Sequence, residues 1–298
     1  MCDSVGVSGA AVLRPHSILG HTYSAVAIAA NGITIVNSLA NIAEASVPNA
    51  DFNFLCSMHL PAPTIIASTN NWIAVNKPSG LLSIQDRHQH DIPSVRSWLE
   101  KQFGTVYVVH RIDKDTSGLI LFAKNETTHK YLSQLFENRQ IQKKYLGLVH
   151  GTPYPADGTV DAPIAEHSAK NGTMIVHARG KHAVTHYHTL QALGKYSLLE
   201  FDIETGRTHQ IRVHAKHIGH PIVADVFYSD GRSVFLSDFK KKVKLSKLEE
   251  EERPMLDRLG LHAHTLAFKD EDGTTVSLEA PLFKDMKALI SQLEKNAR

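Results

Sequence analysis

Short apolar runs of β-strand character recur along the sequence from Thr64 onward, and this recurrence most limits the folds that the chain can adopt. Turn-forming residues separate the runs, and a few segments with helical periodicity lie between them. Strands interleaved with a small number of helices are typical of the α+β class. The sequence therefore predicts an α+β fold with strands at Ile73–Val75, Val106–Val109, Leu119–Ala123, Tyr145–Val149, His182–Leu190, Ser197–Ile203 and Thr275–Glu279.

One helix is predicted after Asn125, which is a suitable N-cap residue. Tyr131, Leu132, Leu135 and Phe136 follow at helical spacing and form one apolar face. We expect this face to pack in the core.

A second helix is predicted over residues 208–218, with Thr208 as its N-cap and Gly219 and Pro221 at its end. Arg207 then lies at the positive end of the helix dipole, and Arg212 lies about one turn further on. Such an entrance suits a carboxylate or a phosphate. A capped helix with solvated cations is the alternative interpretation.

The segment His110–Gly118 sets two carboxylates, Asp113 and Asp115, among cations in a turn between two strand-like runs. Neighbouring cations favour the charged form of a carboxylate, and flanking strands can hold a short loop still enough to position a nucleophile or base. A solvated hairpin loop is the other interpretation, because Asp, Thr, Ser and Gly are ordinary turn residues.

Composition limits the class of protein. The 298 residues have a net charge of +2, so a nucleic-acid partner would have to be met by clustered cations. Cys2 and Cys56 are isolated, which argues against a disulfide framework and fits a reducing compartment. The nineteen histidines have no metal-ligand spacing, and we expect no metal site. No apolar run approaches the ~20 residues of a membrane span, and no signal-peptide pattern is present, so we expect a cytoplasmic protein.

Two segments have unusual composition. Residues 1–63 carry few charges and are interpreted as an N-terminal extension of unknown role, which joins the domain 64–298 at Pro61–Pro63. Residues 240–253 hold a lysine cluster followed by glutamates, and a solvated, self-paired helix or an insertion touching RNA are both open interpretations.

Ordered blocks of sequence resemble the RluA family of pseudouridine synthases. The resemblance covers roughly residues 65 to 284. We expect no S4-type RNA-binding module among the residues before it, because Arg14 is the sole Arg or Lys before Lys77. The matching blocks are Asn76–Leu81, His110–Gly118, Lys143–Val149, Glu204–His214, Leu261–Phe268 and Leu278–Leu282. The resemblance implies a mainly antiparallel mixed sheet with flanking helices, which is a pseudouridine synthase-like catalytic domain.

The resemblance also implies an activity: isomerisation of uridine to pseudouridine without a cofactor. It assigns Asp113 as the catalytic carboxylate, Tyr145 as the ring that packs on uracil and helps to deprotonate C5, and Arg207 as the partner of Asp113. Arg212 is the second candidate for that pairing. Ile112 stands where Leu is common in the family, and this departure does not touch the catalytic trio.

A stacked uridine must leave its helix before a protein can reach C1′ or C5, and Arg111 matches the family position whose side chain fills the gap. Thr116, Lys143 and Arg212 are candidates for holding phosphates. Leu261 is expected either beside the base or in simple core packing.

The sequence thus predicts an enzyme that modifies specific uridines in structured ribosomal or transfer RNA. It is expected to be a monomer with no obligate protein partner. The alternative is a catalytically inactive RNA-binding or assembly protein on the same fold. A metal-dependent hydrolase, the third hypothesis, fails on the spacing of the histidines.

Overall fold

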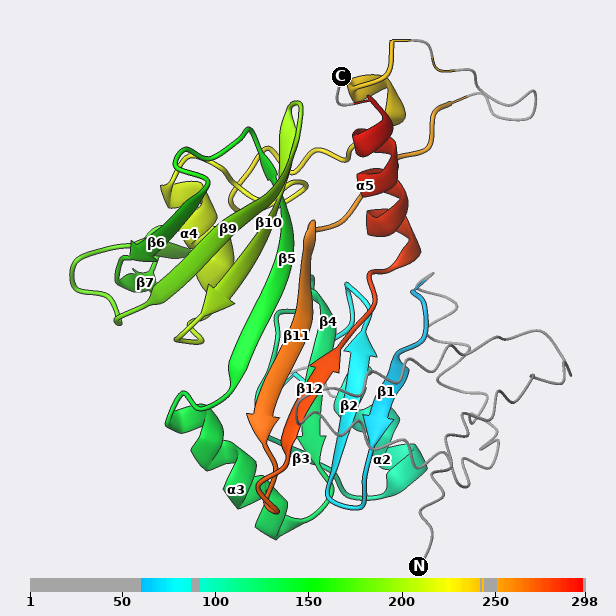
Figure 1. Cartoon of the computed structure of the whole chain (residues 1–298), viewed down its shortest axis with the longest axis vertical. Coiled ribbons are helices and arrows are strands. Elements are labelled where there is room, and N and C mark those ends of the chain that lie inside the picture. The colour runs from blue at the N-terminus through cyan, green and yellow to red at the C-terminus, as the bar shows by residue number, and fades with distance from the viewer. Residues whose placement is uncertain (1–59, 87–91, 242, 244–250, 297–298) are drawn as a thin grey trace, which may run out of the picture.

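One large sheet runs through the molecule. The computed structural model describes residues 60–86, 92–241, 243 and 251–296 (Figure 1). Ten strands form the sheet in the order β1-β2-β4-β11-β5-β10-β9-β6, with β3 paired to β4 and β12 to β11. Its strands are β1 (Thr64–Ser68), β2 (Trp72–Lys77), β3 (Tyr107–Val108), β4 (Ser117–Ala123), β5 (Gln142–His150), β6 (Asp157–Asp161), β9 (Val184–Leu193), β10 (Tyr196–Ile203), β11 (Leu261–Lys269) and β12 (Thr275–Glu279).

The remaining elements flank this sheet. A separate two-stranded sheet pairs β7 with β8, and four α-helices and one 3-10 helix complete the described part of the chain. They are β7 (Ile164–Glu166), β8 (Met174–Val176), α2 (Val95–Phe103), α3 (Glu126–Glu137), α4 (Gln210–His217), η1 (Leu236–Asp238) and α5 (Lys284–Asn296). The α+β prediction is confirmed, and each of the seven predicted strands is present, six with at least one shifted end and β12 with the predicted bounds.

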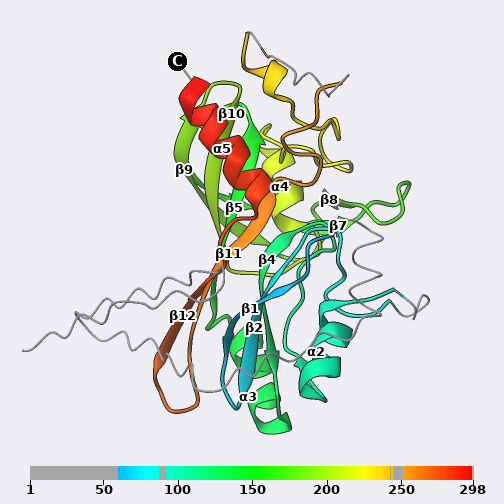
Figure 2. The same ribbon diagram turned by 90° about the vertical axis from the view of Figure 1, so that its right-hand side faces the viewer.

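Both faces of the sheet are covered in each half. Alternate residues of β2 and β4 point to opposite sides: Ile73 and Ile120 pack with α2, whereas Ala74 and Leu121 pack with α3. In the other half, β5 and β10 contribute to one cluster with α4 and to another with α5. Figure 2 shows α5 in front of these strands and α4 to their right. Strand β4 is buried along its whole length because helices cover both of its faces.

The two halves meet at the pairing of β4 with β11, which is the parallel pair of an otherwise antiparallel sheet. The ladder there is short, with His262 opposite Ser117 and Ala263 opposite Gly118. Gly118 has a φ of +112°, and a Cβ at this position would lie 2.2 Å from the carbonyl oxygen of Ala263. Glycine is therefore required where the two backbones approach each other.

The two predicted helices exist. Asn125 caps α3 by accepting from Thr128 N at 2.9 Å, and Leu132 and Leu135 are buried on its inner face as expected. The second helix is α4, which is shorter than predicted. Its N-cap is His209 and not Thr208, and His209 has left-handed backbone angles with no side-chain cap hydrogen bond. The predictions for residues 1–59 and for most of 240–253 lie outside the described residues.

Candidate functional site

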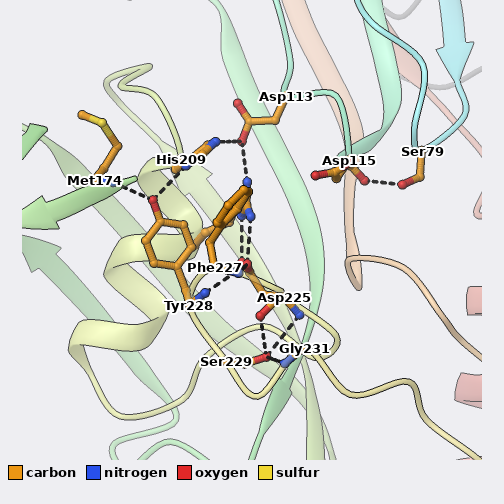
Figure 3. A network of polar contacts seen from close by, with 11 residues as sticks. Ser79, Asp113, Asp115, Met174, His209, Asp225, Phe227, Tyr228, Ser229 and Gly231 are labelled. Carbon is orange, nitrogen blue, oxygen red and sulfur yellow. Dashed lines mark hydrogen bonds and ion pairs between the residues drawn. The ribbon is translucent and has the colours of Figure 1, made fainter. Parts of the chain in front are cut away.

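Asp113 lies in the loop between β3 and β4, and residues 77–83 hold the backbone of this loop in place. Lys77 Nζ donates to the carbonyl oxygen of Lys114 at 2.7 Å, and Gly80 N donates to the same oxygen at 2.9 Å. Ser79 Oγ donates to the carbonyl oxygen of Asp115 at 2.5 Å (Figure 3). These bonds give the loop one defined conformation.

Two further bonds come from Ser83, whose hydroxyl donates to the carbonyl oxygen of Ile112 at 2.7 Å and lies 3.3 Å from the amide nitrogen of the same residue. The loop is therefore fixed at the residue before Asp113 and at the two residues after it.

Lys77 is the centre of this support and is fully buried. Its ammonium donates to the carbonyl oxygens of Pro78, Leu81 and Lys114 at 3.0, 2.7 and 2.7 Å. Burial lowers the pKa of Lys77 to about 7, and the negative charges of Asp115 and Asp113 oppose this shift. Three carbonyl acceptors match the three donors of the ammonium form.

The side chain of Asp113 is 29% exposed and faces two partners (Figure 3). Arg212 Nη1 lies 3.6 Å from Asp113 Oδ2, and His209 Nε2 lies 3.9 Å from the same oxygen. Both partners come from the start of α4. A carboxylate that is partly open to solvent and oriented by a cation can act as a nucleophile or base.

Arg212 is itself held in place from behind. It is 1% exposed, and its Nε and Nη2 donate to the two oxygens of buried Asp225 at 2.7 and 2.8 Å. The guanidinium lies over the rings of Phe227 and Tyr228, at 5.3 and 5.1 Å from their centroids. A bidentate ion pair with flanking aromatic rings fixes the plane of the guanidinium, so Nη1 remains directed at Asp113.

The expected pairing of Arg207 with Asp113 is wrong, since Arg212 makes this contact. Arg207 lies in the turn before α4, and its Nε donates to the carbonyl oxygen of His182 at 3.0 Å. The side chain of Gln210 closes this turn by accepting from Arg207 N at 3.0 Å. Because α4 begins at Gln210, Arg212 lies on its buried first turn, while Arg207 precedes the helix and points toward the start of β9.

Tyr145 and Leu261 lie on the adjacent strands β5 and β11 and belong to one apolar cluster. Burial, and then the negative charge of Asp113, raise the pKa of Tyr145, so its hydroxyl is protonated at neutral pH. A role as base through the phenolate is therefore disfavoured. Leu261 is 3% exposed, as expected for core packing next to the tyrosine.

The predicted RNA-contacting residues differ in accessibility. Arg111 is exposed, two residues from Asp113. Lys143 is half-buried, its Nζ lies 6.0 Å from the centroid of the Phe136 ring, and burial lowers its pKa. Thr116 is 2% exposed and Arg212 1%, so neither side chain presents a surface for a phosphate.

Sequence reasoning missed three residues of the site: His209, Asp225 and Tyr228. His209 lies inside the block Glu204–His214, but its spacing from Arg207 and Arg212 does not indicate that its side chain faces Asp113. Asp225 and Tyr228 follow the apolar segment Pro221–Ala224, and no local pattern connects them with a loop more than one hundred residues earlier.

A cavity of about 760 Å³ lies beside these residues. Its lining includes Asp115, Arg212 and Asp225, together with Arg258 and Phe283. The cavity has the size of a small-ligand site. Because Asp113 and Tyr145 do not line it, it adjoins the carboxylate and is not the space directly in front of it.

Neither a metal site nor a membrane span is found in the described structure. Residues 60–86, 92–241, 243 and 251–296 contain no cluster of three or more His, Cys, Asp or Glu side chains that could hold a metal ion. No helix among them is long and apolar enough to cross a membrane.

Comparisons with known proteins indicate the family of the chain. A family model described as RNA pseudouridylate synthase matches residues 71–217. The ribosomal large subunit pseudouridine synthase D of Zymomonas mobilis is 35% identical over 241 residues, which cover 77% of this chain and 72% of that protein. An uncharacterized RNA pseudouridine synthase of Bacillus subtilis is 41% identical over 190 residues, which cover 63% of this chain but 56% of that protein. The chain thus spans little more than half the length of this second relative.

A solved structure agrees as well. Human RNA pseudouridylate synthase domain containing 4 superposes with a TM-score of 0.59 at 25% sequence identity, and the match covers 78% of this chain and 93% of that one. Sequence, fold and family model therefore place the chain in the RluA-type family of RNA pseudouridylate synthases.

Proposed function

We propose that the chain isomerises specific uridines in structured RNA to pseudouridine, with Asp113 as the catalytic carboxylate. The observation that carries the proposal is the position of Asp113 on a fixed loop, 3.6 Å from a buried arginine that Asp225 holds in place. A rigid carboxylate facing solvent is ready for a reacting group to approach it.

The reaction breaks the bond from N1 to C1′, forms a bond from C5 to C1′, and moves one proton from C5 to N1. All atoms balance within the nucleotide, and no redox partner is required. Asp113 can start it by attacking C1′ or by removing the C2′ proton, and both routes need a carboxylate close to the ribose. Arg212 holds that carboxylate in one orientation by charge.

The ring of Tyr145 is the apolar surface on which the detached uracil would rest, and buried Leu261 packs in the same cluster. An aromatic ring suits the flat base, which must remain close while it rotates. The protonated hydroxyl of Tyr145 is suited to donating a hydrogen bond to the base. Arg111, exposed beside Asp113, has the reach and the planar group to fill the space left in the RNA helix by the extruded nucleotide.

The substrate we propose is a stem-loop of ribosomal or transfer RNA. The name of the Zymomonas mobilis relative refers to the large ribosomal subunit, which favours ribosomal RNA as the first RNA to test. We propose further that the chain works as a cytoplasmic monomer with residues 64–298 as its catalytic domain.

The test is tritium release from RNA labelled at C5 of uridine. Total RNA from cells lacking this protein is the substrate, and the full chain is compared with Asp113→Asn and with Asp115→Asn as a matched control in the same loop. We expect Asp113→Asn to abolish release while RNA affinity in a filter-binding assay stays close to that of the unsubstituted chain. Asp115→Asn should retain activity, because Asp113 and not Asp115 lies within ion-pair distance of Arg212 in the described structure.

Two results would contradict the proposal. Equal release by Asp113→Asn and the unsubstituted chain would remove Asp113 from the chemistry. Tight binding of RNA by the unsubstituted chain with no release of tritium would favour the alternative, an RNA-binding protein without turnover.

A further inference from the structure

His209 connects Asp113 to a hydrogen-bonded chain that ends at the backbone of β8. Its Nε2 lies 3.9 Å from Asp113 Oδ2, and its Nδ1 lies 2.8 Å from the hydroxyl of Tyr228 (Figure 3). The ring also stacks on Phe227, with 5.9 Å between centroids and 20° between planes. The imidazole is therefore held on three sides, with one nitrogen facing the carboxylate.

Tyr228 determines which nitrogen of His209 carries the proton. The Tyr228 side chain is buried, and its hydroxyl oxygen accepts a hydrogen bond from the backbone N–H of Met174 at 2.8 Å. The hydroxyl proton is then directed at Nδ1 of His209, the other polar atom within hydrogen-bond distance in the described structure. A nitrogen that accepts a hydrogen bond carries no proton, so the proton of a neutral ring lies on Nε2.

We propose that Tyr228 fixes His209 as the Nε2–H tautomer, which makes His209 a neutral hydrogen-bond donor directed at the Asp113 carboxylate. The consequence for catalysis rests on the proposed function of Asp113, whereas the tautomer itself does not. His209 is a positioning residue in this proposal, because it acts on the carboxylate and not on the RNA. The distance of 3.9 Å exceeds a hydrogen bond, and such contacts often shorten when substrate binds.

The surroundings of the ring favour its neutral form. Burial lowers the pKa of His209, while Asp113 raises it and Arg212 lowers it further. The remaining charges that act on the ring are Asp225, after α4, and Asp115, in the Asp113 loop. Arg212 Nη1 already provides a positive charge 3.6 Å from Asp113 Oδ2. A neutral His209 therefore helps to orient the carboxylate without adding a second cation.

The tautomer can be measured directly. The full chain, labelled with nitrogen-15 in histidine, is studied by NMR at neutral pH, and the His209 signals are assigned by their loss in His209→Gln. We expect the Nδ1 resonance of an unprotonated nitrogen in the unsubstituted chain and a mixture of tautomers in Tyr228→Phe. A protonated Nδ1 in the unsubstituted chain would overturn the proposal, whether or not the variants fold.

The kinetic test separates positioning from a structural role. Tyr228→Phe should lower kcat about tenfold, the effect of losing one hydrogen bond near a charge, with KM unchanged. His209→Gln keeps a neutral N–H donor near the Nε2 position and should retain most of kcat, whereas His209→Leu should lose at least as much as Tyr228→Phe. His209→Gln and His209→Leu each place a residue other than glycine at the positive φ of position 209, so the two variants carry the same backbone strain.

Tyr131→Phe is the matched control. It removes a tyrosine hydroxyl that donates to the carbonyl oxygen of Lys269 at 2.9 Å, outside the site, and it should leave kcat unchanged. If the unsubstituted chain releases tritium and Tyr228→Phe is equally fast, the inference fails while the proposed function stands. If Asp113→Asn is fully active, the proposed function fails, and the NMR result still decides the tautomer.

Discussion

Arg212 binds two carboxylates at once, and a lysine in its place could not. Its Nε and Nη2 are used by Asp225, which leaves Nη1 for Asp113. A lysine has one nitrogen on a flexible stem, so it would stay with buried Asp225 or turn to Asp113. Arg212→Lys should therefore lower tritium release roughly tenfold or more, as expected for a lost charged hydrogen bond. Arg207→Lys is the control, because a lysine can still donate to the carbonyl of His182 and activity should be retained. A greater loss in Arg207→Lys than in Arg212→Lys would show that the assignment is reversed.

The residue scale also shows where sequence reasoning ends. Asp113, Tyr145 and Leu261 are predicted site residues because their blocks resemble those of the family, and their roles stay predictions. Arg207 precedes the helix and Arg212 lies within it for the predicted start as well as the observed one. The choice between them depends instead on partners distant in sequence, since Asp225 holds Arg212 while the carbonyl oxygen of His182 accepts from Arg207. Asp225 escaped prediction because its partner is thirteen positions away, across the end of a helix.

At the scale of elements, the junction of β4 and β11 is the most demanding contact of the sheet. We expect Gly118→Ala to destabilise the chain by about 1–3 kcal/mol or more, since the new Cβ would lie 2.2 Å from the carbonyl oxygen of Ala263. Gly273→Ala in the turn between β11 and β12 is the control, because Gly273 also has a positive φ of 83° but no atom within 4 Å. Urea denaturation should give a clearly lower midpoint for Gly118→Ala than for Gly273→Ala. Equal midpoints would mean that the two strands can separate at little cost. Strand β4 was predicted from its apolar run, but β11 was not among the predicted strands. Their parallel pairing was not predicted either, because periodicity identifies a strand and not its neighbour.

At the scale of the whole molecule, two histidines that burial keeps neutral, half-buried His110 and fully buried His262, make stability depend on pH. Burial, and then the charge of Lys143, lower the pKa of His110 to about 3, and its Nε2 accepts from Leu121 N on β4. Burial lowers the pKa of His262 to about 4, although its bond to the Ala280 carbonyl opposes this shift. An unfolded histidine takes up a proton near pH ~6.5, so below that value the unfolded chain binds protons that the folded chain excludes. Their contribution is complete above pH ~6.5 and is lost progressively as the pH falls toward the folded values.

The urea midpoint of the unsubstituted chain should therefore be lower at about pH 5 than at neutral pH. His110→Gln should make that fall smaller, whereas the exposed His177→Gln should leave it unchanged. A midpoint that is constant or rises on acidification would contradict the assignment of neutral buried rings. His110 accepts a hydrogen bond from β4, and His262 lies on the partner strand β11 at the middle of the sheet. We therefore expect acid to destabilise the two halves of the sheet together.

The support of the Asp113 loop has one more consequence. Its hydrogen bonds reach the backbone of residues 112, 114 and 115, and the Asp113 side chain takes no part in them. The backbone support of the loop is thus independent of the proposed catalytic carboxylate, and we expect exchange of this carboxylate for an amide to leave the proposed RNA-binding surface in its original shape. Asp113→Asn is accordingly suited as bait: cross-linked in living cells, it would retain its natural target long enough for sequencing to read which transcript it holds.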